Sequence, residues 1–237
     1  MSRVHAIVTA AGSSSRMAGV DKLLLPLNGL PLLVRTLEPF LDLSELESVV
    51  VAVNPERCLE FKELFAKHFP DTAKRITVTA GGDHRQQSIL NALRVLWESA
   101  SPEARVLIHD GARPFVGPRL FQTLLAKLAD FDGVIPALPV RDTVKKIEGP
   151  RVLSTQDRET LRLVQTPQAF RFDTILELHE KAAGENFLGT DDASLLERYG
   201  RTVGWVEGPI HNLKVTVPQD IDLLEHLFSR AKESVTP

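Results

Sequence analysis

The stretch VHAIVTAAG, residues 4–12, decides how this chain folds. Its first six residues are an apolar run rich in β-branched side chains, which predicts a buried strand. The small residues Ala10, Ala11 and Gly12 follow the strand directly. Small residues at the carboxyl end of a strand let the backbone approach a ligand closely, and their N–H groups can bind an anion. The stretch therefore predicts a buried strand that ends at a candidate binding site.

Strand and helix patterns alternate along the chain beyond this stretch. Within residues 85–97, for example, apolar side chains recur at helical spacing and predict one apolar helix face, formed by Ile89, Leu90, Leu93, Leu96 and Trp97. Strands that alternate with helices of this length join through right-handed crossovers. The sequence therefore predicts an α/β fold, a Rossmann-like and mostly parallel sheet with helices on both faces. The predicted strands are residues 4–9, 48–53, 76–79, 105–109 and 133–136, and the predicted helices are residues 31–41, 56–68, 85–97 and 118–128.

The alternation stops at residues 137–166, where no helical stripe is present. The turn signal Glu148-Gly149-Pro150 divides this segment into two extended parts, which predicts a long β-arm. An isolated hairpin is only marginally stable in water, so the arm should pack against something. A second subunit is one partner, which would make the protein a homodimer. The alternative is that the arm extends the main sheet, and the sequence leaves both open.

The C-terminal part of the chain returns to regular patterns. Residues 173–185 and 191–199 predict helices, the second of them capped by Thr190 and ended by Gly200. Residues 202–207 and 213–217 predict strands, and an amphipathic helix runs from Gln219 to about Lys232. With no repeat and no linker segment, residues 1–237 are interpreted as one domain with the arm at about residues 137–166.

Composition limits the classes of function. Of the 237 residues, 43% are hydrophobic and 25% are charged, which is ordinary for a globular protein and excludes disorder as its main state. A net charge of −3 argues against a broad nucleic-acid or membrane surface. The single cysteine, Cys58, cannot form an internal disulfide. Short apolar runs and the lack of a signal-peptide pattern predict a soluble, cytoplasmic protein.

Polar and small residues follow three of the predicted strands, beginning with the first. After the first strand come Arg16 and Lys22, whose charges suit a phosphate chain, although a flexible small-residue turn explains the glycine and serines equally well. The segment lacks the Gly-Lys-Ser/Thr of a Walker A loop and the glycines of the dinucleotide fingerprint. After the third strand come Gly82, Asp83 and Ser88, which could read the polar edge of a base. Taken alone, that segment is better explained as a helix start capped by Asp83.

The strand at residues 105–109 ends in His109-Asp110-Gly111-Ala112-Arg113-Pro114. Asp110 is a hard oxygen ligand suited to Mg²⁺, and Arg113 would contact phosphate. The alternative is an Asp110–Arg113 ion pair that fixes the turn. His109 is interpreted as a packed strand residue. Because parallel strands open their carboxyl ends on one side of a sheet, all three edges should line one crevice, which favours the functional interpretation.

The motifs at these edges resemble those of a known family. Ala-Ala-Gly-x-x-x-Arg-Met from Ala10, followed by a lysine, is similar to the signature of sugar-phosphate nucleotidyltransferases. Further motifs narrow this resemblance to one family. They are Gly-Gly-Asp-x-Arg-x-x-Ser from Gly81, His-Asp-x-Ala-Arg-Pro from His109, Val-Arg-Asp-Thr, Thr-Pro-Gln, Thr-Asp-Asp-Ala-Ser and Asn-Leu-Lys-Val-Thr. Together they resemble the 2-C-methyl-D-erythritol 4-phosphate cytidylyltransferase family, over nearly the whole chain.

The resemblance implies a reaction and a role for each matching residue. CTP and methylerythritol phosphate would be joined with release of pyrophosphate, in non-mevalonate isoprenoid synthesis, by a homodimer with interlocked arms that uses Mg²⁺ or another divalent metal. Lys22 is taken as the matching lysine although the family usually has Pro-Lys-Gln at Asp21-Lys22-Leu23. The implied roles are cytidine binding by Ala10, Ala11, Gly12, Gly82, Asp83 and Ser88, triphosphate binding and catalysis by Arg16, Lys22 and Lys214, metal binding by Asp110, and sugar-phosphate binding by Arg113, Thr143, Thr166, Thr190 and, from the partner subunit, Arg158.

Two other functions stay open at this stage. A cytidylyltransferase for ribitol 5-phosphate shares much of the pattern, and a non-catalytic nucleotide-binding regulator could use the same fold. Retention of Arg16, Asp110 and Lys214 together favours an enzyme. The sequence offers no convincing Ser-His-Asp or paired-carboxylate constellation. A phosphate monoester needs none, because it is mostly dianionic at pH 7 and is itself the nucleophile.

Overall fold

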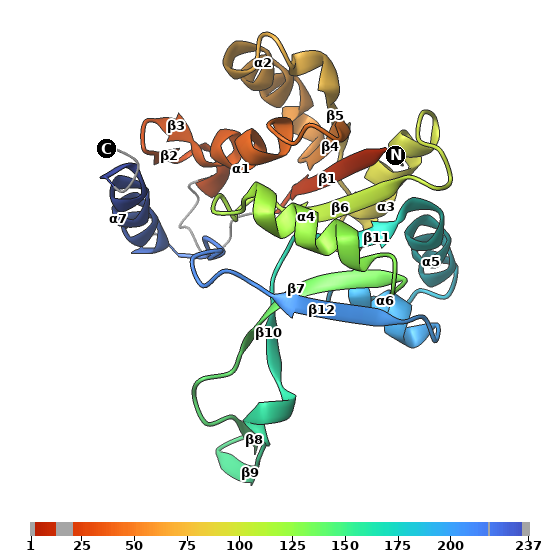
Figure 1. Ribbon diagram of the computed structural model, residues 1–237, viewed down its shortest axis with the longest axis vertical. Helices are drawn as coiled ribbons and strands as arrows, with labels where there is room; N and C mark the ends of the chain where they lie inside the picture. The colour runs from red at the N-terminus through yellow and green to blue at the C-terminus, as the bar shows by residue number, and fades with distance from the viewer. Residues whose placement is uncertain (1–2, 13–20, 218, 234–237) are drawn as a thin grey trace.

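A computed structural model describes residues 3–12, 21–217 and 219–233, and its centre is an eight-stranded sheet (Figure 1). The strands lie in the order β10–β7–β11–β6–β1–β4–β5, and β12 pairs with β7. The strands of this sheet are β1 (Val4–Ala10), β4 (Leu46–Val53), β5 (Ile76–Ala80), β6 (Arg105–Asp110), β7 (Gly133–Pro139), β10 (Arg162–Val164), β11 (Gln168–Arg171) and β12 (Val203–Glu207). Two small sheets pair β2 (Pro26–Leu27) with β3 (Leu30–Pro31) and β8 (Lys145–Glu148) with β9 (Arg151–Thr155).

Helices pack on both faces of the central sheet. These helices are α1 (Leu32–Leu41), α2 (Cys58–His68), α3 (Arg85–Trp97), α4 (Pro118–Lys127), α5 (Phe172–Gly184) and α6 (Ala193–Arg198), whereas α7 (Gln219–Glu233) lies beside β2. On β1, Ala6 and Val8 point to the core beneath α1, α2 and α4, whereas Ile7 points to the core beneath α3, α5 and α6. This two-sided burial explains the continuous apolar run of the first strand and confirms the predicted layers.

The sheet is mixed but mostly parallel, as predicted. β1 runs parallel to both β4 and β6, β4 runs parallel to β5, and β12 runs parallel to β7. The exceptions are β11, which runs antiparallel to β6 and β7, and β10, which runs antiparallel to β7. Because Thr9 pairs with Asp110, and Ala10 with Val53, the carboxyl ends of β1, β6 and β4 lie at one edge.

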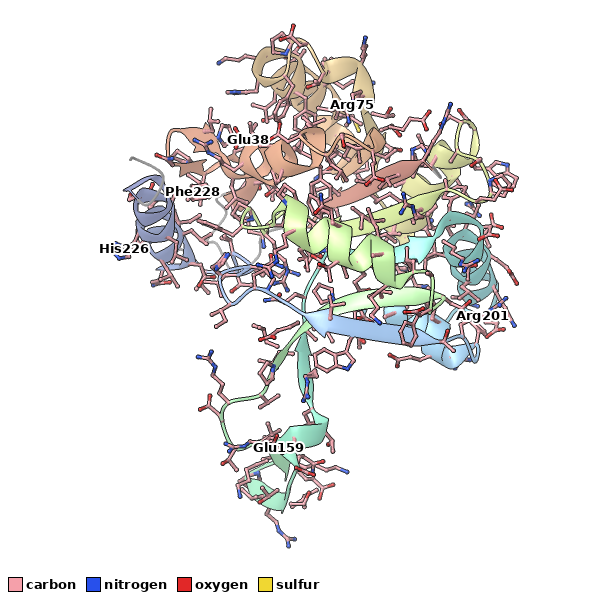
Figure 2. The ribbon with its side chains drawn as sticks, in the orientation of Figure 1. Glu38, Arg75, Glu159, Arg201, His226 and Phe228 are labelled. Carbon is pink, nitrogen blue, oxygen red and sulfur yellow. The ribbon has the colours of Figure 1, made fainter. Side chains whose placement is uncertain are left out.

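The arm extends the main sheet at its base, which is one of the two arrangements that the sequence left open, and projects from the sheet beyond it. At its base, β10 pairs with the end of β7, so this part extends the main sheet. Beyond the base, β8 and β9 form a separate hairpin whose turn holds Gly149 at a φ of +53°. Figure 1 shows the hairpin standing well away from the sheet, and Figure 2 shows Glu159 on this projecting part.

The C-terminal helix α7 lies against the α1 side of the molecule. In Figure 2, Phe228 points to the body while His226 points away from it. The Phe228 ring lies 4.1 Å from that of Phe115, measured between centroids, and the Arg35 guanidinium lies over the same ring. Of the described helices, none is long and apolar enough to cross a membrane.

Three local predictions were wrong. The described residues 213–217 form no strand, because the N–H groups of Thr216 and Val217 donate to the Asp220 carboxylate at the start of α7. Asp191, rather than Thr190, accepts the Ser194 N–H at the start of α6, so the helix begins later than predicted. Trp97 is 60% exposed and stacks on Phe172 at the edge of the predicted apolar face. Gly200 ends α6 at a φ of +70°, as predicted.

Gly133 offers a test of packing where β7 meets β11 and β12. A Cβ added there would lie 2.7 Å from Leu196 Cδ2 and 2.8 Å from the Phe170 ring, in the fully buried core. We expect Gly133→Ala to lower the free energy of unfolding by about 1–3 kcal/mol, as overpacked cores do. Gly184→Ala is the control, because a Cβ at Gly184 meets nothing within 4 Å. Equal urea midpoints for the two variants would contradict this account of the junction.

Candidate active site

Two adjoining cavities open at the carboxyl edge of the sheet. The first, of about 380 Å³, lies where β1, β6 and the start of α3 meet, and the second, of about 330 Å³, lies between β6 and the segments around Thr166 and Thr190. Arg85, Asp110 and Lys214 line both cavities. Of the residues singled out in the sequence, the first cavity also has Ala10, Ala11, Gly12, Lys22, Gly82, Asp83 and Ser88, and the second has Arg113, Thr166 and Thr190.

The carboxylate of Asp110 is the centre of charge between the cavities. Its Oδ1 lies 3.2 Å from Arg85 Nε, and its Oδ2 lies 2.9 Å from Lys214 Nζ and 3.5 Å from Arg113 Nε. Burial opposes ionisation of this side chain, but the three positive charges outweigh it and hold the pKa of Asp110 well below its usual range. Asp110 is therefore a carboxylate throughout the physiological pH range.

The pKa values of the two arginines beside Asp110 are shifted in opposite directions. Burial alone would lower the pKa of Arg85, but Asp192 and Asp110 together raise it. Burial lowers the pKa of Arg113, and its contact with Asp110 offsets only part of that effect. Arg113 Nη1 also donates to the Asn212 carbonyl at 2.8 Å, which ties β6 to the segment that carries Lys214. The predicted Asp110–Arg113 ion pair is thus present within a larger cluster.

His109 is buried beneath the site and contacts two of its residues, Arg113 and Thr166. The ring is fully buried; its Nε2 donates to the Arg113 carbonyl at 2.9 Å, and its Nδ1 lies 3.0 Å from the Thr166 hydroxyl. That hydroxyl oxygen also accepts the Asp110 N–H at 3.1 Å. Burial lowers the pKa of His109 to about 4, so the ring is neutral. This confirms that His109 is a packed strand residue, and it shows how Thr166 is fixed beside Asp110.

Lys22 reaches the first cavity from a short 3-10 helix, Lys22–Leu24. Asp21 begins this helix, because its Oδ1 accepts the Leu23 N–H at 2.9 Å, and its Oδ2 accepts from Arg57. Lys22 Nζ donates to the Val215 carbonyl at 2.9 Å. The Asp21-Lys22-Leu23 sequence therefore places the lysine on the cavity wall, next to the segment of Lys214.

The turn before α3 packs the backbone tightly against the first cavity. An added Cβ at Gly81 would lie 2.4 Å from Ala11 Cβ, so only glycine fits there. The Gly82 N–H donates to the Ser88 hydroxyl, which in turn donates to the His84 carbonyl. The predicted cap by Asp83 was wrong: His84 Nδ1 accepts the Gln87 N–H at 3.1 Å, because His84 is the residue that directly precedes the helix. Asp83 remains on the cavity wall.

Of the predicted site residues that the structure describes, two do not line these cavities. Thr143 and Arg158 lie exposed on the arm, where Arg158 Nη1 donates to the Arg141 carbonyl at 2.9 Å. Arg16 lies outside the described residues. Among the residues that are described, no cluster of three His, Cys, Asp or Glu side chains could hold a metal ion.

Comparison with known proteins identifies the family. A family description named 2-C-methyl-D-erythritol 4-phosphate cytidylyltransferase matches residues 4–230. The chain belongs to this family. A cytidylyltransferase of that name from Bacillus mycoides is 43% identical over 96% of this chain and 98% of its own, and one from Geobacillus thermodenitrificans is 44% identical over 95% and 96%.

Solved structures agree with the family assignment. 4-diphosphocytidyl-2C-methyl-D-erythritol synthase from Anaerococcus prevotii is similar to this chain with a TM-score of 0.82 and 29% identity, covering 96% of each chain. The cytidylyltransferase from Thermus thermophilus has a TM-score of 0.74 and 32% identity, covering 94% of this chain and 98% of its own. The fold described here is thus that of the cytidylyltransferase family.

Sequence reasoning missed part of this family member's site. Arg85 and Asp192 form a 2.8 Å ion pair, and Gln168 Nε2 donates to Asp191 Oδ2 at 2.7 Å. Arg85 stood inside a quoted motif but had no assigned role, and a charged residue in the first turn of a helix is usually a solvated one. The burial of Asp192 and Gln168 had no signal in the local pattern, because it depends on elements that are distant in sequence.

The neutral ring of His109 predicts an acid-sensitive stability. Since its pKa is about 4 in the folded protein and 6.5 ordinarily, its contribution is complete above pH 6.5 and is lost as the pH falls toward 4. We expect up to about 3 kcal/mol of the unfolding free energy to disappear over this range through His109 alone. His109→Gln removes the titrating group, so its unfolding free energy, measured in urea without metal, should fall less steeply. Parallel pH curves for parent and variant would contradict this expectation.

Proposed function

We propose that the chain transfers the cytidylyl group of CTP to 2-C-methyl-D-erythritol 4-phosphate, giving 4-diphosphocytidyl-2-C-methyl-D-erythritol and pyrophosphate for non-mevalonate isoprenoid synthesis. Membership of the cytidylyltransferase family supports the activity. The single structural observation that carries it is the pair of cavities that share Asp110, Lys214 and Arg85. A transfer between two bound molecules needs two sites that meet at the reacting atoms.

We assign the nucleotide to the first cavity. The small residues Ala11, Gly12 and Gly82 on its wall let a bound nucleotide approach the backbone closely. The triphosphate would meet Lys22 and Lys214, joined by Arg16 on the basis of its matching motif. The remaining residues assigned to the cytidine are Ala10, Asp83 and Ser88.

We assign the sugar phosphate to the second cavity. Arg113 offers a guanidinium for the phosphate, while Thr166 and Thr190 offer hydroxyls for the polyol. Lys214 lies on the wall between both cavities, so its ammonium can contact both phosphates at the moment of transfer. Arg158 is assigned to the same substrate from the arm of a second subunit, and because Thr143 lies on the same arm, we now extend that assignment to it.

The reaction is an in-line substitution at the α-phosphorus of CTP. A phosphate oxygen of the sugar phosphate forms the new P–O bond, while the bond from the α-phosphorus to the pyrophosphate oxygen breaks and that oxygen keeps the electron pair. The attacking phosphate is already mostly dianionic, since its second pKa is about 6. This chain therefore contributes charge and alignment. Cationic side chains screen two polyanions and stabilise the negative charge that gathers on the five-coordinate phosphorus.

A divalent metal, proposed as Mg²⁺, fits the donor set at Asp110. An ionised carboxylate at the shared wall is a hard ligand, and Mg²⁺ in nucleotide sites is usually held by one or two carboxylates plus phosphate oxygens. When bound, such a metal would supply further charge neutralisation of the phosphates. Asp110 would hold it, and Lys214, which pairs with Oδ2, would be released toward the phosphates.

A substrate-panel assay separates the three candidate functions. Pyrophosphate release should require CTP and methylerythritol phosphate together, and ribitol 5-phosphate should give little turnover. Faster turnover with ribitol 5-phosphate would assign the rival activity. Calorimetric binding of CTP with no turnover of either sugar phosphate would identify a regulator and overturn the proposal.

The roles of the two lysines predict the effect of removing them. We expect Lys22→Ala and Lys214→Ala each to lower kcat by about 10²–10³-fold, because losing one donor to a developing oxyanion costs that much in other enzymes. Both variants should keep the parental thermal unfolding midpoint within a few degrees. Lys62→Ala, at an exposed position of α2, is the control and should retain full activity. Near-normal kcat in both lysine variants would remove their proposed roles.

The arm is the basis for the proposed homodimer. Its hairpin exposes Ile147 and Val152, which are 65% and 62% accessible, and neither contributes to the core of its own chain. Arg158 is likewise exposed and lies away from both cavities. A second copy would cover the apolar side chains and receive Arg158 at its sugar-phosphate site.

Heterodimers test whether the arms complete each other's sites. Two tagged copies, one with Arg158→Ala and one with Lys214→Ala, would be co-expressed and purified through both tags. If Arg158 acts across the dimer, one of the two sites is intact, and we expect about half of the wild-type activity. If it acts within its own subunit, both sites are damaged and activity stays near that of the single-variant homodimers. That second result would contradict the exchange of arms.

A further inference from the structure

A chain of polar side chains leads from Asp110 into the interior of the protein. Asp110 Oδ1 pairs with Arg85 Nε at 3.2 Å, and Arg85 Nη1 pairs with Asp192 Oδ2 at 2.8 Å. Asp192 Oδ1 in turn lies 3.1 Å from His179 Nε2. The four residues come from β6, α3, the start of α6 and α5. Side chains from four separate elements thus form one connected line.

Arg85 is suited to join the two carboxylates. Asp110 and Asp192 are 7% and 1% exposed, so each needs a buried positive partner. Burial opposes the ionisation of Asp192, but the Arg85 charge and the His179 contact keep its pKa lowered. A guanidinium presents N–H groups along two directions of a rigid plane, whereas an ammonium is a single point of charge. Only an arginine can therefore hold both carboxylates in this geometry at once.

His179 completes the line, and it also lines a third cavity, of about 240 Å³, beside α3. The Asp192 carboxylate can only accept, so His179 Nε2 carries the proton and donates it. Its Nδ1 has no hydrogen-bond partner among the described residues, and the ring is fully buried. His179 lines neither of the two cavities that share Asp110. Its side chain therefore bears on the site through Asp192.

The line also connects the two sides of the reaction. Asp192 directly follows Thr190 and Asp191, which line the second cavity, while Asp110 lies between the cavities. We propose that Arg85 and His179 are positioning residues: with Asp192 they fix the Thr190–Asp191 segment relative to the Asp110 carboxylate, and so align the sugar phosphate with the nucleotide. This inference rests on the proposed cytidylyltransferase function.

His179 provides a matched pair of variants at a distance from both substrates. His179→Leu leaves Asp192 Oδ1 without its donor, whereas His179→Gln keeps an N–H that can donate to it. We expect His179→Leu to lower kcat by on the order of 10–100-fold, the range found when a group that orients an active-site residue is removed, with the Kd of CTP unchanged. His179→Gln should recover most of the loss. Wild-type kcat in a folded His179→Leu protein, or an equal loss in His179→Gln, would overturn the proposal.

Hydrogen exchange gives a second readout that does not depend on turnover. If the line couples the two sides, His179→Leu should raise amide exchange both in residues 189–195 and in residues 109–113, and His179→Gln should raise it in neither. Faster exchange confined to residues 189–195 would mean that His179 supports only its own surroundings, and would overturn the coupling. An inactive wild-type enzyme would instead reject the proposed function, and the exchange result would still decide whether the line exists.

Arg85→Lys separates positioning from direct binding. The variant keeps a positive charge but can hold only one carboxylate at a time, so kcat should fall by on the order of 10–100-fold while the Kd of CTP, measured by calorimetry, stays within about 3-fold. A loss of CTP affinity as large as the loss of kcat would show that Arg85 binds the nucleotide directly. That outcome would overturn its role as a positioning residue.

Discussion

The ionised carboxylate of Asp110 is the interaction on which the rest of the site depends. Arg85, Arg113 and Lys214 all carry positive charge within a few ångströms of one another, and without a negative partner they would repel. Asp110 makes this concentration of charge compatible with a folded protein that has bound no substrate. When a triphosphate and a phosphate monoester arrive, the cations exchange one negative partner for others. Asp110 thus lessens the repulsion among side chains whose positive charge suits them to polyanions.

The topology of the sheet brings these charges together. Parallel pairing of β4, β1 and β6 places three carboxyl ends at one edge, which supplies the first cavity. The reversed strand β11, inserted between β6 and β7, then brings the preceding residue Thr166 back to Asp110. A purely parallel sheet would carry that segment away to the opposite edge. The mixed pairing is therefore what adds a second cavity, the one that we assign to the sugar phosphate, beside the first.

The sequence predicted what depends on local pattern. The strand β1 and the helix α3 were recognisable because burial on two faces and burial on one face leave distinct periodicities. The caps at Asp83 and Thr190 were misplaced because several neighbouring polar residues could serve, and only backbone geometry decides between them. Arg85, Asp192 and His179 had no role from sequence because polar pairs between distant elements have no period. The convergence of Asp110 with Lys214, by contrast, was expected from the family motifs alone.

The exposed side chains of the arm are the observations that favour an interaction with a second copy of the chain. Pairing between β7 and β10 fixes the base of the arm, and the hairpin beyond it extends into solvent. A two-stranded hairpin with exposed Ile147 and Val152 gains little from its own packing, and such apolar surface favours association. Thr143 and Arg158 lie on the same projecting hairpin region and line neither cavity, although the family resemblance gives both a role in binding the sugar phosphate. A second copy of the chain would explain both observations, because it would cover Ile147 and Val152 and would receive Thr143 and Arg158 at its own site.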